Sequence, residues 1–266
     1  MTSKSIRSKG PFRLALVTGA SSGIGKALCR LLAKEGIHLV ITGRNKMNLY
    51  HIADELRSYV NIVVYPADLS NREERKKIIQ KIHELSPDLV INNAGFGVYG
   101  KATDLGSEPQ LDMVEVNVQA LMELTTESAK AMLDAKHPGV IMNISSVAGH
   151  FPFPGFAAYA ASKAFVNSYS IALDEELKEH GIYVLASCPG RVQTNFTFRA
   201  SRGRRKKQDP NKMDVNFAAN QIWSQILKKK AIHTFTGKYR VAEFLIKYIL
   251  PRRLVLKILK RRILKD

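Results

Sequence analysis

A tyrosine and a lysine spaced by one helical turn are the first candidates for chemistry in this sequence. Tyr159 and Lys163 lie four residues apart, so both side chains fall on one helical face. A free phenol has a pKa of about 10 and transfers protons poorly at neutral pH. A cation held close favours the phenolate and lowers that pKa, which would make Tyr159 a general acid or base.

Polar residues close two of the expected strands. Asn143 and Ser145 end the strand expected over residues 140–144, and Asn93 and Gly95 follow the one over 88–91. Ordinary caps and turns use the same residue types. Ligands of open α/β sheets bind at the carboxyl ends of strands, however, and several such features in register indicate a site there.

A glycine-rich turn follows the first expected strand, residues 13–18, and opens a helix over 24–35. Gly19, Gly23 and Gly25 permit a tight turn and close approach of the backbone to a pyrophosphate at the helix N-terminus. The turn also fits the G-x-S-x-G elbow of α/β-hydrolases. That elbow follows a central strand and precedes an acid and a histidine, a context absent here, so a dinucleotide is the favoured ligand.

The end of the second expected strand carries Arg44, about 20 residues past the glycine turn. An acid at this place would bind the ribose 2′-hydroxyl of NAD, whereas an arginine suits the 2′-phosphate of NADP. A solvated surface arginine is the alternative. Asp68 follows the third strand and is expected near the adenine.

These residues must be positioned by parallel β-α-β units, because short apolar runs alternate with helical patterns. Long helices are expected over 111–136 and 158–179. We predict one Rossmann-like α/β domain, a doubly wound parallel β-sheet with helices on both faces. The expected strands cover residues 13–18, 37–42, 61–65, 88–91, 140–144 and 182–187.

Residues 12–195 resemble the short-chain dehydrogenase/reductase (SDR) superfamily. The resemblance rests on TGASSGIG (18–25), NNAG (92–95), Asn117, Ser145, Tyr159 with Lys163, and the run from Pro189 to Thr194. It implies that Tyr159 exchanges a proton with the substrate oxygen and that Ser145 polarises that oxygen. Lys163 would hold the nicotinamide ribose, and Asn117 would hold a water of the proton relay.

The glycine turn and the resemblance together assign the residues that would bind NADP(H). They are Gly19, Ser21, Ser22, Gly23, Ile24, Gly25, Arg44, Asp68, Leu69, Asn93, Ala94, Gly95, Tyr159, Lys163, Pro189, Gly190, Val192 and Thr194.

Aromatic residues surround the expected substrate end. Phe151 and Phe153 precede Tyr159, and Phe196 begins a lid expected over 194–212. With Ser145 and Tyr159 they predict a pocket for an apolar, lipid-like ketone or a 3-oxoacyl group, free or on an acyl carrier. Packing of the aromatics under the loop or at a subunit contact is equally open.

The formal net charge of +18 is concentrated in three stretches. Residues 1–10, 199–207 and 247–266 hold 17 of the 41 basic residues and one of the 23 acids, which leaves +2 on the rest. That distribution argues against nucleic-acid binding and for local contact with something anionic.

We expect a flexible basic N-terminus (1–11), the oxidoreductase domain (12–240) and a basic amphipathic helical extension (241–266). On a helical wheel of the extension, Val255, Ile258, Leu259 and Ile263 share one side. It would touch an anionic membrane peripherally, or else pack on the body or on a second subunit.

Two distant cysteines, no metal-type spacing and no long apolar run predict a reduced, metal-free, cytoplasmic enzyme. The resemblance implies a homodimer or homotetramer. The expected reaction is NADPH-dependent reduction of a ketone. An alcohol or sugar dehydrogenase working oxidatively and a non-catalytic NADP-binding sensor remain the alternatives.

Overall fold

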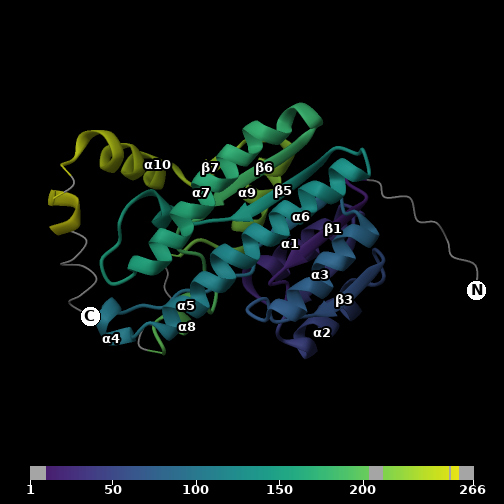
Figure 1. Ribbon diagram of the computed structural model, residues 1–266, viewed down its shortest axis with the longest axis horizontal. Coiled ribbons are helices and arrows are strands. Elements are labelled where there is room, and N and C mark those ends of the chain that lie inside the picture. Colours follow the sequence, from purple (N-terminus) through teal and green to yellow (C-terminus); the bar gives the residue numbers. More distant parts are fainter. Residues whose placement is uncertain (1–9, 204–211, 252, 258–266) are drawn as a thin grey trace, which may run out of the picture.

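A seven-stranded parallel sheet forms the centre of the chain, in the strand order β3-β2-β1-β4-β5-β6-β7 (Figure 1). The computed structural model describes residues 10–203, 212–251 and 253–257. The strands are β1 (Leu14–Thr18), β2 (His38–Gly43), β3 (Ile62–Pro66), β4 (Leu89–Asn92), β5 (Gly139–Ile144), β6 (Ile182–Cys188) and β7 (Ile232–Thr234).

The Rossmann-like, doubly wound sheet predicted from the sequence is confirmed, with strand ends shifted by at most one residue. Strands β1, β4 and β5 are buried along their whole length, because helices cover both faces. The short β7 was not predicted. It pairs with β6 in parallel and extends the sheet by one strand.

Two helical layers enclose the sheet. Apolar residues of α1 (Gly23–Lys34), α2 (Lys46–Leu56) and α9 (Val215–Leu227) form the core of one face. Those of α3 (Arg72–Leu85), α6 (Leu121–Asp134) and α7 (Ala157–Leu177) form the core of the other.

Side-chain caps fix where several of these helices begin. The carboxamide oxygen of Asn45 accepts from the Asn48 N–H at the start of α2, and that of Asn71 accepts from the backbone N–H of Glu73 and Glu74 at the start of α3. Capping oxygens satisfy N–H groups that lack partners inside the helix. The caps therefore set the register with which each helix packs on the sheet.

The long helix expected over residues 111–136 is composite. It runs from α5 (Glu108–Val114) through a π-helical turn, η1 (Glu115–Ala120), into α6. Asn117 lies inside the π-helical turn. Such turns widen a helix locally and often lie at functional sites.

Shorter elements complete the fold: α4 (Ala102–Leu105), η2 (Val147–His150), η3 (Lys178–His180), α8 (Phe196–Ala200), α10 (Gly237–Phe244) and η4 (Leu245–Ile249). Of the lid expected over 194–212, the structure describes α8 and its neighbours, while residues 204–211 lie outside the described part. The C-terminal element begins at Gly237 rather than at 241. None of the helices among the described residues has the length and apolarity to cross a membrane.

Candidate active site

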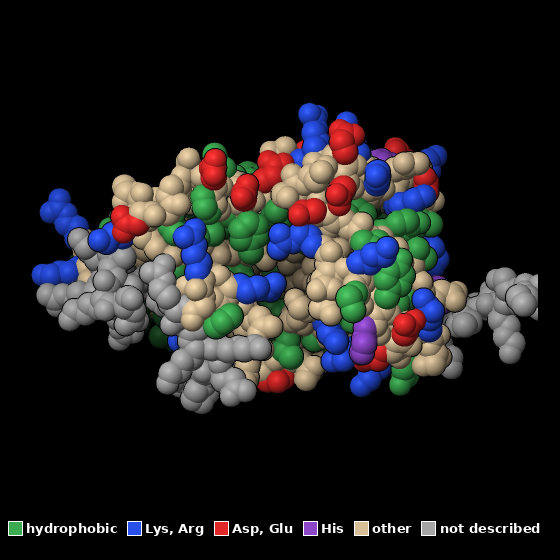
Figure 2. Space-filling view, turned by 90° about the horizontal axis from the view of Figure 1, so that it is seen from below, with side chains coloured by type: hydrophobic (Ala, Val, Ile, Leu, Met, Phe, Trp, Pro, Cys, Tyr) green, Lys and Arg blue, Asp and Glu red, His purple; other side chains and the backbone are tan. Residues whose placement is uncertain are grey.

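A cavity of about 1460 Å³ opens at the carboxyl ends of the strands, beside the β1–β4 junction where the strand order reverses. Figure 2 shows a face of the molecule that is hollowed near its centre, with Lys and Arg side chains around the hollow. The cavity is lined by these expected residues: Gly19, Ser21, Ser22, Gly23, Ile24, Arg44, Asp68, Leu69, Asn93, Ala94, Gly95, Ser145, Phe153, Tyr159, Lys163, Pro189, Gly190, Val192, Thr194 and Phe196. The expected residues that do not line it are Gly25, Asn117 and Phe151.

The glycine turn at one end of the cavity fits a pyrophosphate. Gly19 and Gly23 have φ of 63° and 57°, which glycine adopts without strain. A Cβ on Gly25 would lie 2.4 Å from the Gly19 carbonyl oxygen, so Gly25 serves packing and not contact. Helix α1 begins here without a side-chain cap and without an acidic residue in its first turn. Its N-terminal N–H groups are therefore available to an anion.

Asn93 locks this turn to β4 instead of pointing an open amide into the cavity. Its Nδ2 donates to the carbonyl oxygens of Thr18 and Gly19 at 2.9 and 3.2 Å. The backbone N–H groups of Asn93 and Ala94 both donate to Thr18 Oγ1. The NNAG segment thus holds the glycine turn in shape from the neighbouring strand.

Arg44 and Asp68 lie together at the same end of the cavity as the glycine turn, since Gly43 adjoins Ser21. The Arg44 guanidinium is 3.9 Å from the Asp68 carboxylate, and 64% of the Arg44 side chain is exposed. A loose, solvated ion pair of this kind contributes little by itself. The guanidinium remains able to reorient toward a 2′-phosphate.

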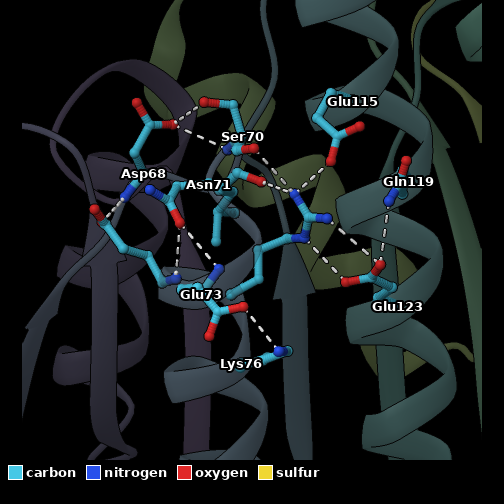
Figure 3. A network of polar contacts seen from close by, with 11 residues as sticks. Asp68, Ser70, Asn71, Glu73, Lys76, Glu115, Gln119 and Glu123 are labelled. Carbon is cyan, nitrogen blue, oxygen red and sulfur yellow. Dashed lines mark hydrogen bonds and ion pairs between the residues drawn. The ribbon is translucent and has the colours of Figure 1, made fainter.

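A buried arginine that the sequence analysis missed fixes the loop behind Asp68. The Arg75 side chain has no exposed surface; it donates to the Leu69 carbonyl oxygen at 2.8 Å and forms ion pairs with Glu115 and Glu123 at 2.6 and 2.9 Å. The same guanidinium also donates to the Ser70 carbonyl oxygen at 3.3 Å. Ser70, Glu115 and Glu123 are labelled in the polar network of Figure 3. Arg75 therefore ties the loop carrying cavity residue Leu69 to the helix that carries the π-helical turn.

Tyr159 and Lys163 share one face of α7 at the other end of the cavity, and both are buried. The Lys163 Nζ lies 5.9 Å from the centre of the Tyr159 ring and donates to the Ile144 carbonyl oxygen at 2.8 Å. Burial lowers the pKa of Lys163 to about 8, because the interior penalises the charged form.

The pKa of Tyr159 departs from expectation. Burial raises the pKa of the phenol above its ordinary value, and a hydrogen bond with Ser146 opposes that rise only in part. Lowering of this pKa by Lys163, as expected from the sequence, is not what the structure shows. The phenol therefore holds its proton at neutral pH.

The serine beside Tyr159 is Ser146 and not Ser145. The Ser145 hydroxyl donates inward to the Lys163 carbonyl oxygen at 3.0 Å, although the residue also lines the cavity. Ser146 lines the cavity as well, hydrogen-bonds with the Tyr159 phenol, and accepts from the Ala148 N–H at 3.1 Å. Side chains alternate between the two sides of an extended chain, so two adjacent serines cannot both face Tyr159.

Asn117 lies behind the site. Its Oδ1 accepts from the Phe96 N–H at 3.1 Å, and its Nδ2 donates to the Phe96 carbonyl oxygen and to Ser162 Oγ. The side chain is fully buried and committed to these partners. It anchors the segment after β4 to α7, a positioning role, and its amide does not reach into the cavity.

Aromatic rings form the substrate end. Phe156 stacks between Tyr99 and Tyr159, with ring centroids 3.8 and 4.1 Å apart, and Phe196 lies 5.5 Å from Tyr159. Tyr99 and Phe156 line the cavity but were not in the expected substrate set. Phe151 was expected there, yet it packs against Phe153 outside the cavity lining.

Known proteins are similar to this chain in sequence and in fold. The short chain dehydrogenase family matches residues 13–205. An uncharacterised oxidoreductase of Staphylococcus aureus (strain MW2) is 34% identical over 200 residues, which cover 74% of this chain and 86% of that protein.

Two solved structures agree with the fold along most of the chain. A short-chain dehydrogenase from Sphingobium yanoikuyae in complex with NADPH matches with a TM-score of 0.79 at 28% identity, covering 96% of this chain and 95% of the other. The bulky-bulky ketone specific alcohol dehydrogenase from Comamonas testosteroni matches with a TM-score of 0.76 at 29% identity, covering 90% and 95%. On the strength of the cavity, its glycine turn and these matches, the chain belongs to the short chain dehydrogenase family of oxidoreductases.

Proposed function

We propose that the protein is an NADPH-dependent reductase that delivers hydride to the carbonyl carbon of a bulky, apolar ketone. One observation carries the proposal: a single cavity has an open helix N-terminus and Arg44 toward one end, and Tyr159, Ser146 and Lys163 at the other. A nucleotide bound along this cavity would supply the hydride beside the phenol.

The proton chemistry follows from the site. As hydride adds, negative charge develops on the carbonyl oxygen. Tyr159 then donates its phenolic proton, which burial holds in place at neutral pH. The Ser146 hydroxyl accepts from the Ala148 N–H, which leaves its own proton able to be donated to the same substrate oxygen. Both donors therefore stabilise the transition state more than the ground state.

Lys163 has a holding role. One of its three N–H donors is used by the Ile144 carbonyl oxygen, which leaves two for the hydroxyls of a nicotinamide ribose. A Cβ on Gly95 would lie 2.8 Å from Asn117 Oδ1, so glycine at this place lets the backbone pass close to Asn117 beside the ammonium. Asn117 supports the arrangement from behind.

The cofactor preference is proposed on Arg44. Its exposed guanidinium at the adenine end can make a charge-assisted contact with a 2′-phosphate, which NADH lacks. The NADPH complex of the Sphingobium yanoikuyae relative agrees with this choice. The protonated phenol is the form that donates a proton in the reductive direction.

The substrate class rests on the aromatic wall of Tyr99, Phe153, Phe156 and Phe196. Bulky ketones, lipid ketones and 3-oxoacyl groups all fit its apolar character, and the Comamonas testosteroni relative is specific for bulky-bulky ketones. We propose a homodimer or homotetramer in the reducing cytoplasm, where free, buried Cys29 and Cys188 stay reduced. Contact with anionic membranes is proposed through the basic C-terminal segment.

The test is NADPH oxidation with a panel of bulky apolar ketones, 3-oxoacyl thioesters and sugars, with NADH in parallel. Ser146→Ala should lower kcat by about 100-fold, while Ser145→Ala, its matched neighbour, should retain most of it. Equal losses in the two variants would refute the assignment of Ser146. Turnover of sugars alone would refute the apolar substrate class.

A further inference from the structure

The C-terminal element carries a continuous stripe of exposed apolar side chains. Val241, Phe244, Leu245, Tyr248 and Ile249 recur at the spacing of one helical face, and we call them the apolar stripe. Phe244 is 56% exposed and Tyr248 is 72% exposed. No residue of α10 or η4 is buried. Exposed apolar side chains gathered on one helical face are typical of a site where another surface binds.

The stripe lies in a strongly basic environment. Residues 237–257 contain six basic residues and one acid, Glu243. That acid is already engaged by Lys247 at 2.9 Å and by His150 at 3.1 Å. Among the described residues of this segment, Lys238, Arg240, Arg253 and Lys257 form no ion pair, so their positive charge is uncompensated there. A helix with an apolar face and cationic flanks fits a surface that is apolar within and anionic outside.

The apolar stripe is not the helical face that the sequence analysis expected to touch a membrane. Val255, the only described member of the wheel face predicted from the sequence, is buried at 5% exposure. Residues 258–266, which hold Ile258, Leu259 and Ile263, lie outside the described residues. The contact surface that the structure offers is thus α10 and η4, upstream of the predicted one.

The stripe is joined firmly to the catalytic end of the cavity. His150, four residues after Ser146, contacts Glu243 of α10 through Nδ1 and Thr234 of β7 through Nε2 at 3.0 Å. Thr234 in turn donates to Glu243 at 2.8 Å. The Tyr239 ring of α10 packs on cavity residue Gly190, where a Cβ would lie 2.2 Å from the ring. In Figure 1, α10 lies at the same end of the molecule as α4 and α8.

A bilayer fits the stripe better than a second copy does. A two-fold self-contact would bring each cationic flank against its own like charge, with Glu243 already paired. An anionic bilayer instead compensates those cations and buries the apolar side chains. The family match ends at residue 205, so the stripe lies outside the matched oxidoreductase segment.

We propose that the apolar stripe docks the enzyme on an anionic lipid surface and holds the substrate end of the cavity beside the bilayer. Apolar ketones would then enter from the membrane. This second step rests on the proposed reductase function, whereas docking itself does not.

The experiment is sedimentation of the full chain with phosphatidylcholine vesicles, prepared with and without phosphatidylglycerol. The wild type should bind the anionic vesicles, and the double variant Phe244→Ser, Tyr248→Ser should bind at least about tenfold more weakly, since each lost ring removes buried apolar area. The matched control is Met47→Ser, Tyr59→Ser, which removes two exposed apolar side chains in and just after α2, far along the chain from the stripe. It should bind like the wild type.

Activity and mass distinguish the outcomes. With a water-soluble ketone and no vesicles, both double variants should turn over like the wild type. With a ketone dissolved in the vesicles, only the stripe variant should lose kcat/KM.

Failure of the wild type to bind, or equal binding by all three proteins, would overturn docking. A fall in oligomer mass in the stripe variant would identify the stripe as a subunit contact instead. Vesicle binding without reduction of any ketone would refute the reductase function alone.

Discussion

Replacing Lys163 by methionine should stabilise the protein while it abolishes activity. Lys163 is buried, and burial lowers its pKa from 10.5 to about 8. Because each pKa unit corresponds to about 1.4 kcal/mol, holding this ammonium in the interior at neutral pH costs about 3 kcal/mol. Methionine has a similar length and no charge, but it forfeits the hydrogen bond to Ile144, worth about 1 kcal/mol. The net gain at pH 7 should be about 2 kcal/mol.

The stability difference between Lys163→Met and the wild type should depend on pH. Between pH 8 and 10.5 the unfolded lysine binds a proton that the native one has lost, so the stability of the wild type rises with pH relative to the variant. The advantage of Lys163→Met should therefore shrink by about 1 kcal/mol from pH 7 to pH 9. Urea unfolding of both proteins at the two pH values measures this. A variant that is less stable than the wild type at pH 7, with a gap independent of pH, would refute the reasoning.

Two further predictions concern the cofactor and the core. Arg44→Ala should raise the KM for NADPH by about tenfold and leave that for NADH unchanged, since a single charge-assisted contact is lost; steady-state kinetics with both nucleotides decide, and equal effects on the two would exclude a 2′-phosphate contact. Burial raises the pKa of Cys29 to about 12, so its stabilising effect is complete below pH 9 and is lost as the pH rises toward 12. The stability deficit of Cys29→Ala should accordingly shrink by about 1 kcal/mol between pH 8 and pH 10 in urea unfolding under reducing conditions, and a constant deficit would contradict this.

Local sequence patterns were sufficient to predict the sheet and the end of the cavity that carries the glycine turn. Five of the six predicted strands are apolar runs that are buried along nearly their whole length, which leaves little ambiguity; β3 is the more exposed one. The glycine turn and Arg44 could be placed because both adjoin predicted strands. β7 was missed because it spans only three residues, Ile232–Thr234, and owes its strand conformation to pairing with β6.

Side-chain direction and tertiary burial could not be predicted. Ser145 and Ser146 are chemically identical neighbours, and only the position of α7 decides which one faces Tyr159. Arg75 lies in the charged run REERKK, which is typical of a solvated helix, yet its side chain is wholly buried by partners 40 and 48 residues away. Phe151 and Phe156 lie five residues apart in one aromatic segment, and of these two the fold brings only Phe156 to the cavity.

The pKa of Tyr159 likewise could not be predicted from the sequence. Proximity of Lys163 could be inferred from the spacing, but the burial that raises the pKa of the Tyr159 phenol depends on tertiary packing, with the rings of Phe156 and Phe196 beside it. Those rings meet only in the folded chain.

The central claim is that Tyr159 transfers the proton at this site, and comparison of binding with turnover in Tyr159→Phe tests it most directly. Phenylalanine keeps the ring packed against Phe156 and removes only the hydroxyl. NADPH fluorescence titration should give the wild-type Kd, while NADPH oxidation with the best ketone of the panel should fall by at least about 100-fold. Turnover close to that of the wild type in Tyr159→Phe would contradict the account.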